Sequence, residues 1–106
     1  WDLFFPEYVR TLVKKGAEII INPTAGYHKD MHTVRAKDNG VYIVTAGAQP
    51  TEAVVINPDG KIIAGESTDG IAKAEIDLNE RFPVFPAYSE RRSVYLNEMR
   101  NELYSY

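Results

Sequence analysis

The apolar positions near the start of the chain recur at helical spacing and predict a helix from Phe5 to Lys15. Its apolar stripe would consist of Tyr8, Val9, Leu12 and Val13. Pro6 suits the first turn of a helix, where a missing N–H costs nothing, and Gly16 suits a left-handed C-terminal cap. The segment is therefore expected to form an amphipathic helix with a defined beginning and end.

Two apolar runs on either side of a second helix follow. Residues Ala17–Asn22 form a short apolar run that Pro23 ends, which is typical of a buried parallel strand. Asp30 is expected to cap a helix that ends at Asn39 and Gly40. The β-branched and aromatic run Val41–Ala46 predicts the next strand. This order of elements predicts an α/β sheet with helices packed on it.

The next part of the chain is expected to form short strands joined by tight turns. Two strands, Ala53–Ile56 and Lys61–Gly65, would be connected by the turn sequence Asn-Pro-Asp-Gly. A second turn at residues 67–70 would lead into a third strand, Ile71–Ile76. Asp77 would then cap a short helical turn, Leu78–Phe82.

Two segments differ in character, which divides the chain into a domain at residues 1–82 and a tail at residues 83–106. Pro83 and Pro86 predict an extended linker, and a helix is expected from Ser89 through Tyr104. The stripe of this helix is loose, so two placements remain open. The tail either crosses a second subunit, or it packs on its own domain or frays.

Composition narrows the class of protein. The chain has 106 residues, a net charge of −3 with interspersed charges, and no Cys. A length of this order allows one small domain. Interspersed charge argues against a nucleic-acid surface, and no apolar run approaches the roughly 20 residues of a membrane span. We expect no cofactor, a cytoplasmic location and, since no Met begins the chain, a longer parent protein.

Three sequence blocks together resemble the carbon–nitrogen hydrolases, the nitrilase and amidase superfamily. The first is Trp-Asp-Leu-Phe-Phe-Pro-Glu at residues 1–7, followed by the helix and Ala-Glu-Ile-Ile-Ile-Asn-Pro. The second is Val-Arg-Ala-Lys-Asp-Asn-Gly-Val-Tyr-Ile-Val at residues 34–44. The third runs from residue 55 to residue 78 and ends in Ile-Asp-Leu. Their order and spacing are similar to those of the family.

The resemblance implies both a fold and a reaction. The chain would form the C-terminal half of an α-β-β-α sandwich, completed by a missing N-terminal half and assembled as a homo-oligomer. The parent would hydrolyse a small-molecule amide, carbamoyl compound or nitrile with a Cys nucleophile, a Glu and a Lys, all outside this chain. The Cys would directly precede Trp1, whose backbone N–H would bind the oxyanion.

Other residues of this chain would support that site. The resemblance implies a pair between Glu7 and Arg35 behind the nucleophile turn; the alternative is two solvated helix charges. Asp2 would cap the helix or orient the turn. Thr24 and Tyr27 follow the carboxyl end of a strand, where ligands gather in open α/β sheets, so they are candidate pocket residues. An exposed loop Tyr is the alternative for Tyr27.

Some features depart from the family pattern. Asp38 stands where the family has Glu, Gly47 lies near a common Asn position, and Thr51-Glu52-Ala53 replaces Gly-x-Ser. These changes leave open a catalytically inactive binding or scaffold protein as the alternative function. The pair His28 and His32 has metal-binding spacing, but no third ligand follows, so a solvent-facing pair and no metal site are expected.

Overall fold

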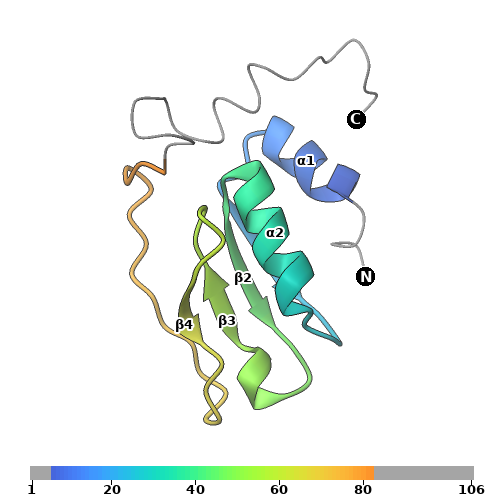
Figure 1. Ribbon diagram of the computed structural model, residues 1–106, viewed down its shortest axis with the longest axis vertical. Helices are drawn as coiled ribbons and strands as arrows, with labels where there is room; N and C mark the ends of the chain where they lie inside the picture. The colour runs from blue at the N-terminus through green and yellow to red at the C-terminus, as the bar shows by residue number, and fades with distance from the viewer. Residues whose placement is uncertain (1–5, 83–106) are drawn as a thin grey trace.

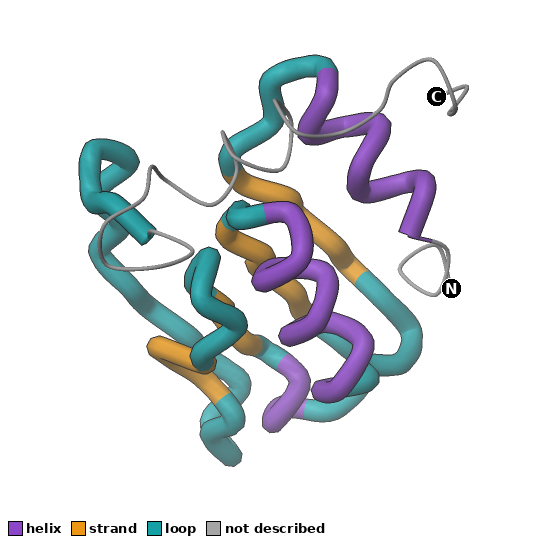
Figure 2. The backbone as a smooth tube through the Cα atoms, turned by 45° about the horizontal axis from the view of Figure 1, so that its top comes forward, coloured by secondary structure: helices purple, strands orange, loops and turns teal. Residues whose placement is uncertain are grey.

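Two helices cover one face of a four-stranded sheet in the computed structural model, which describes residues 6–82 (Figure 1). Both helices lie on the same side of the strands (Figure 2). Neither helix in these residues has the length and apolarity needed to cross a bilayer. The elements are α1 (Pro6–Lys14), β1 (Ile19–Pro23), α2 (Lys29–Asn39), β2 (Tyr42–Ala46), the 3₁₀ turn η2 (Pro50–Glu52), β3 (Val54–Ile56) and β4 (Ile62–Gly65).

The sheet has the order β1-β2-β3-β4 and mixes two kinds of pairing. Strands β1 and β2 are parallel, with Ile20 opposite Ile43, and α2 forms the crossover between them. The remaining two pairs are antiparallel. The Asn-Pro-Asp-Gly turn between β3 and β4 is confirmed, because Asn57 Oδ1 accepts the N–H groups of Asp59 and Lys61 at 3.0 Å. The predicted α/β class and the first four strands are therefore confirmed.

Helix α1 buries a narrower stripe than its sequence predicted. Val9 and Val13 are each 1% exposed, but Tyr8 and Leu12 are 57% and 47% exposed. The helix ends as predicted: Gly16 has φ +103°, its N–H bonds to Val13 O at 2.9 Å, and the Ala17 N–H bonds to the Leu12 O at 3.1 Å. These two bonds form a Schellman cap and turn the chain into β1.

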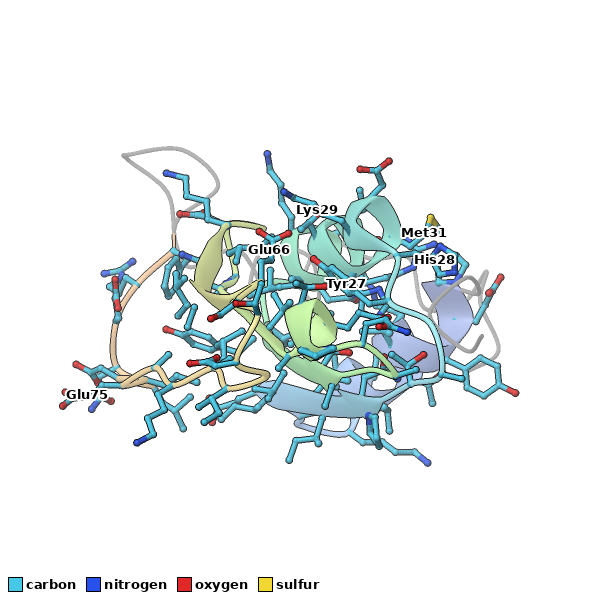
Figure 3. The ribbon with its side chains drawn as sticks, turned by 90° about the horizontal axis from the view of Figure 1, so that it is seen from below. Tyr27, His28, Lys29, Met31, Glu66 and Glu75 are labelled. Carbon is cyan, nitrogen blue, oxygen red and sulfur yellow. The ribbon has the colours of Figure 1, made fainter. Side chains whose placement is uncertain are left out.

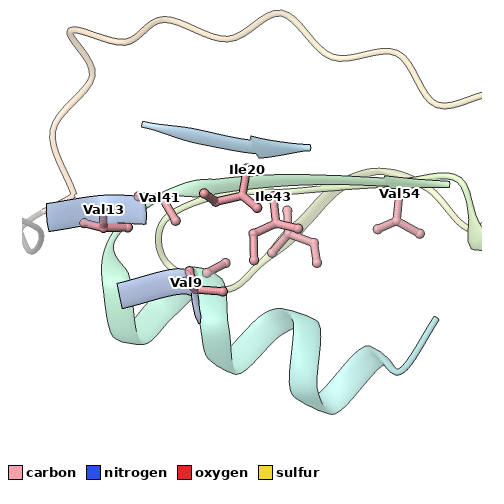
Figure 4. Packing of buried hydrophobic residues seen from close by; sticks show 8 residues of the cluster. Val9, Val13, Ile20, Val41, Ile43 and Val54 are labelled. Carbon is pink, nitrogen blue, oxygen red and sulfur yellow. The ribbon is translucent and has the colours of Figure 1, made fainter. Parts of the chain in front are cut away.

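The core lies between the helices and the sheet (Figure 4). The side chains of α1 meet those of the strands on one sheet face, and Ala36 of α2 fills the space where that helix approaches closely. The buried members of the cluster are Val9, Val13, Ile20, Ala36, Val41, Ile43, Val54 and Ile56. Alternation along each strand places these side chains on a single face.

The opposite face of β1 is open in the described part of the chain, so this strand is buried on one face there. Ile21 is 76% exposed and Ile19 is 37% exposed. Among the described residues, only the segment 72–76 runs over this side of the sheet, next to Val44 and Val55. An apolar surface of this kind is a common mark of a contact surface.

The strand expected at residues 71–76 was wrong, and the capped turn expected after Asp77 is present but shorter than predicted. The segment 71–76 is extended but forms no strand, because it lies over a sheet face and not beside an edge with free backbone groups. Asp77 closes a single turn, accepting the Asn79 N–H at its Oδ1 and the Glu80 N–H at its backbone O, and no helix follows to Phe82. The expectations for the tail, from Pro83 onward, fall outside the described residues.

The start of α2 also differs from expectation. The helix begins at Lys29, with His28 at the N-cap position and no side-chain cap bond. Asp30 is thus already inside the first turn, where its carboxylate lies near the positive end of the helix dipole. The predicted C-terminal cap is confirmed, since Gly40 has φ +64° and its N–H bonds to Ala36 O.

Candidate functional site

Three loops meet at the end of the sheet where β1 and β2 finish. We call residues 24–28, 47–53 and 66–70 the rim loops. The first is tied to the end of β2 by the Thr24 N–H, which bonds to the Ala46 O at 2.9 Å. The third bonds to the second through the Glu66 N–H and Ala53 O at 3.2 Å. An ion pair of 3.5 Å joins Lys29 to Glu66 above them (Figure 3).

Thr24 and Tyr27, the predicted pocket residues, both lie in the first rim loop. Thr24 Oγ1 accepts the Gly26 N–H at 3.2 Å and donates to the Gly26 O at 2.9 Å, so its hydroxyl shapes the loop. The Tyr27 ring is not an exposed loop side chain: it packs against the core and lies edge-on to the His32 ring at 4.9 Å.

The hydroxyl of Tyr27 is buried and has no hydrogen-bond partner within residues 6–82. Burial, together with the nearby carboxylates of Glu66 and Asp30, raises the pKa of Tyr27 to about 12. The phenol therefore keeps its proton at ordinary pH and can donate to a group placed beside it. Thr45 Oγ1, on β2, is a second buried hydroxyl oxygen for which the described part of the chain holds no partner.

A buried polar contact lies beside the Tyr27 ring. His32 is 3% exposed, with Nδ1 at 2.8 Å from the His28 carbonyl and Nε2 at 2.9 Å from Asn22 Oδ1. Burial lowers the pKa of His32 and favours the neutral ring. The His28 N–H also donates to Nδ1 at 3.3 Å, so the roles of the two ring nitrogens as donor or acceptor are set by the tautomer.

The position of His32 corrects the expected solvent-facing histidine pair. Helix α2 lies on the sheet, and position 32 shares its inward face with Arg35, Ala36 and Asn39. His28 precedes the helix and is exposed. Within residues 6–82, no three His, Asp or Glu side chains gather in a way that could hold a metal ion.

Arg35 forms a different ion pair from the one expected. It is 7% exposed, and its Nη1 lies 3.3 Å from Asp38 Oδ2, one turn along the same helix. Glu7 lies exposed in the first turn of α1, and its carboxylate forms no ion pair within the described residues. Asp38 is the nearer carboxylate, because residues three positions apart lie on the same face of a helix.

Asp38 is the centre of a small network. Its Oδ1 accepts the Asn39 amide at 2.6 Å, and its backbone O accepts Arg10 Nη2 of α1 at 2.7 Å. Burial raises the pKa of Asp38, while Arg35 and Arg10 act in the opposite direction. The motif thus fixes α2 and links it to α1. Trp1 and Asp2, the other predicted site residues, lie outside the described residues.

Sequence reasoning missed Glu52 and Asn22. Glu52 Oε2 accepts the Tyr27 N–H at 2.8 Å, across two rim loops. Its only signal in the sequence was its place between Thr51 and Ala53, the two residues that differ from the Gly-x-Ser of the family. Asn22 stood out in the sequence as a polar residue at the end of an apolar run. Its contact with His32, 10 positions away, could not be predicted from local spacing.

Comparison with known proteins identifies the family. A model of the carbon–nitrogen hydrolase family matches residues 1–82. The chain belongs to that family. It is 34% identical over 91 residues to a nitrilase of Pyrococcus abyssi, with 74% of this chain covered. It is 28% identical over 122 aligned positions to the omega-amidase NIT2 of Danio rerio, with 99% of this chain covered.

The chain corresponds to only part of these relatives. It covers 35% of the nitrilase and 42% of the omega-amidase. The fold described above is a mixed α/β unit that fits such a part.

Proposed function

We propose that this chain is the C-terminal part of an enzyme that hydrolyses a non-peptide carbon–nitrogen bond in a small amide, carbamoyl compound or nitrile. The observation that carries the proposal is the family match over residues 1–82, which includes α1, the sheet and the rim loops. A Cys nucleophile, a Glu and a Lys would come from the parent chain upstream of Trp1. The nitrilase and omega-amidase relatives support this class of reaction.

The beginning of the chain would contribute to the nucleophile site. In our proposal the Cys directly precedes Trp1, and the Trp1 backbone N–H donates to the oxyanion. Asp2 would orient the turn between them. Helix α1 begins at Pro6, and the positive end of its dipole favours a thiolate nearby. Because the thiolate is the reactive form of Cys, this placement would activate the nucleophile.

The pocket wall would include the first rim loop. Thr24 and Tyr27 lie at the carboxyl ends of parallel strands, where open α/β sheets bind ligands. The buried Tyr27 hydroxyl is a donor without a partner in residues 6–82 and could receive a polar substrate group. Arg35 would act indirectly, by holding α2 through Asp38.

The open face of β1 suggests where the upstream half of the protein packs. Ile19 and Ile21 present apolar surface there, and a second sheet laid on this face would complete an α-β-β-α sandwich. Homo-oligomerisation of the completed protein is part of the same proposal.

The decisive experiment measures ammonia release by the intact protein from a panel of small amides and nitriles. We expect turnover that is abolished when the residue preceding Trp1 is changed from Cys to Ala, and selective labelling of that thiol by iodoacetamide. An intact, folded protein without ammonia release and without a reactive thiol would instead be the inactive binding or scaffold protein. The departures from the family pattern near Gly47 and at Thr51-Glu52-Ala53 are the observation that supports this second candidate.

A further inference from the structure

The carboxylate of Glu52 holds two rim loops together. Its Oε2 accepts the Tyr27 N–H at 2.8 Å, and its Oε1 accepts the Gln49 N–H at 3.2 Å. The first bond joins residues 25 positions apart in the chain. Hydrogen bonds from backbone N–H groups to a carboxylate are stronger than those to neutral acceptors. We call this arrangement the Glu52 clasp.

The clasp requires a glycine at position 47. A Cβ built on Gly47 would lie 2.7 Å from Glu52 Cβ and 2.8 Å from Glu52 Cδ, and closer still to Oε2. Side-chain carbons do not approach this closely, so any larger residue at position 47 would displace the carboxylate. Glycine is needed here for space and not for its backbone conformation, since its φ is not positive.

Gly47 and Glu52 therefore depend on each other. Gly47 provides the space, and Glu52 fills it and reaches Tyr27. The clasp fixes the backbone of Tyr27, while the ring is fixed by its edge-on contact with His32. Together they determine where the buried hydroxyl of Tyr27 lies.

We propose that Glu52 is a positioning residue that sets the place of Tyr27 in the substrate pocket, and that Gly47 is its obligatory companion. The role in the pocket rests on the proposed hydrolase function; the clasp does not. Glu52 acts through Tyr27 and touches no reacting atom. Its loss should therefore weaken substrate binding and leave the chemical step intact.

The experiment compares variants of the intact protein by steady-state kinetics on small amides and by thermal unfolding. The set is Glu52→Ala, Glu52→Gln, Gly47→Ala and the double variant Gly47→Ala/Glu52→Ala, with Glu75→Ala as the matched control. Glu75 is an exposed glutamate far from the rim loops (Figure 3).

For Glu52→Ala we expect KM to rise about tenfold with kcat within about twofold, the effect of losing one hydrogen bond to a charged group. Glu52→Gln should restore most of the KM, because its amide oxygen still accepts the Tyr27 N–H. Gly47→Ala should lower Tm when it is the only substitution, but not when Glu52→Ala is also present. The control should match the parent.

Three results would overturn the proposal. Additive Tm shifts for Gly47→Ala and Glu52→Ala would show that the clasp does not exist. A fall in kcat at unchanged KM, or unchanged kinetics, would show that Glu52 does not position Tyr27 for binding. A parent protein without any hydrolysis would refute the proposed function and with it the pocket role, while the Tm coupling would still decide the clasp.

Discussion

Arg35→Ala in the intact protein gives the sharpest test of how α2 is held. The Arg35 side chain is 9% exposed, and its guanidinium is the cation paired with Asp38. Truncation removes that cation and the buried stem of the side chain. It leaves Asp38, already half-buried and bonded to Asn39, as a carboxylate whose ion-pair partner is gone.

The magnitude follows from burial. Removing one partner of a fully buried ion pair costs about 3–5 kcal/mol, because the other charge stays buried and unpaired. The Asp38 side chain is 36% exposed, so water solvates the remaining charge and reduces this cost. We therefore expect Arg35→Ala to lower the free energy of unfolding by about 2–3 kcal/mol at neutral pH, with activity falling in parallel.

The pH dependence of the stability lost in Arg35→Ala tests this explanation. Burial already raises the pKa of Asp38, and loss of Arg35 removes an opposing charge, so the pKa rises further. A carboxyl with a raised folded-state pKa stabilises the protein below its unfolded pKa and loses that contribution as pH rises through the folded value. The deficit of Arg35→Ala should thus be small near pH ~4 and full near pH ~7.

Urea unfolding across this pH range measures the deficit, and Arg35→Ala/Asp38→Asn is the control. The second substitution removes the stranded charge and should recover part of the lost stability at neutral pH. A deficit that is independent of pH, or one that Asp38→Asn deepens, would refute the reasoning. Unchanged activity in a normally folded Arg35→Ala protein would refute its link to the site.

Three further predictions concern the sheet face and the rim. If an upstream sheet covers β1, Ile21→Asp should lower the free energy of unfolding of the intact protein by about 2–4 kcal/mol, measured in urea. The control Leu78→Asp, which introduces the same charge at another apolar residue, should lower it by under ~0.5 kcal/mol. Equally small losses for both variants would contradict the sandwich. The pKa of His32 is lowered in the folded state, so its contribution to stability is present above pH ~6.5 and is lost as the pH falls below that value. The free energy of unfolding should then fall by at most ~1.4 kcal/mol per pH unit, and His32→Gln should flatten this slope. Tyr27→Phe should leave Tm unchanged or higher and raise KM; a lower Tm would show that the hydroxyl already has a partner.

Most of the element order could be predicted from the sequence because local signals specify it. Gly16 and Gly40 adopt positive φ and end α1 and α2 as expected. The Asn57 turn is fixed by side-chain bonds to the backbone only a few positions away. The strand predicted at residues 71–76 is absent. Alternation of apolar and polar residues suits a strand, but a strand also needs a neighbouring strand edge to pair with, and the pattern does not reveal whether one is present.

The contacts of the site were harder to predict, for a physical reason. Arg35 pairs with Asp38 rather than Glu7, a choice that depends on distance and not on residue type. Whether His32 faced solvent or the sheet depended on the rotation of α2 about its axis, and a helix with little amphipathic pattern does not reveal it. Local rules specify neighbours along the chain, whereas these side chains meet partners chosen by packing.

The clasp also bears on the choice between an enzyme and an inactive relative. A site without a function has no need to keep its buried space filled and its polar groups paired. Here the space at Gly47 is filled by Glu52, and both Glu52 oxygens receive backbone N–H groups. This arrangement holds the backbone of Tyr27 at the end of β1 and β2. An ordered rim is what a binding pocket needs, so the clasp supports the hydrolase that we propose over its alternative, a scaffold without a working site.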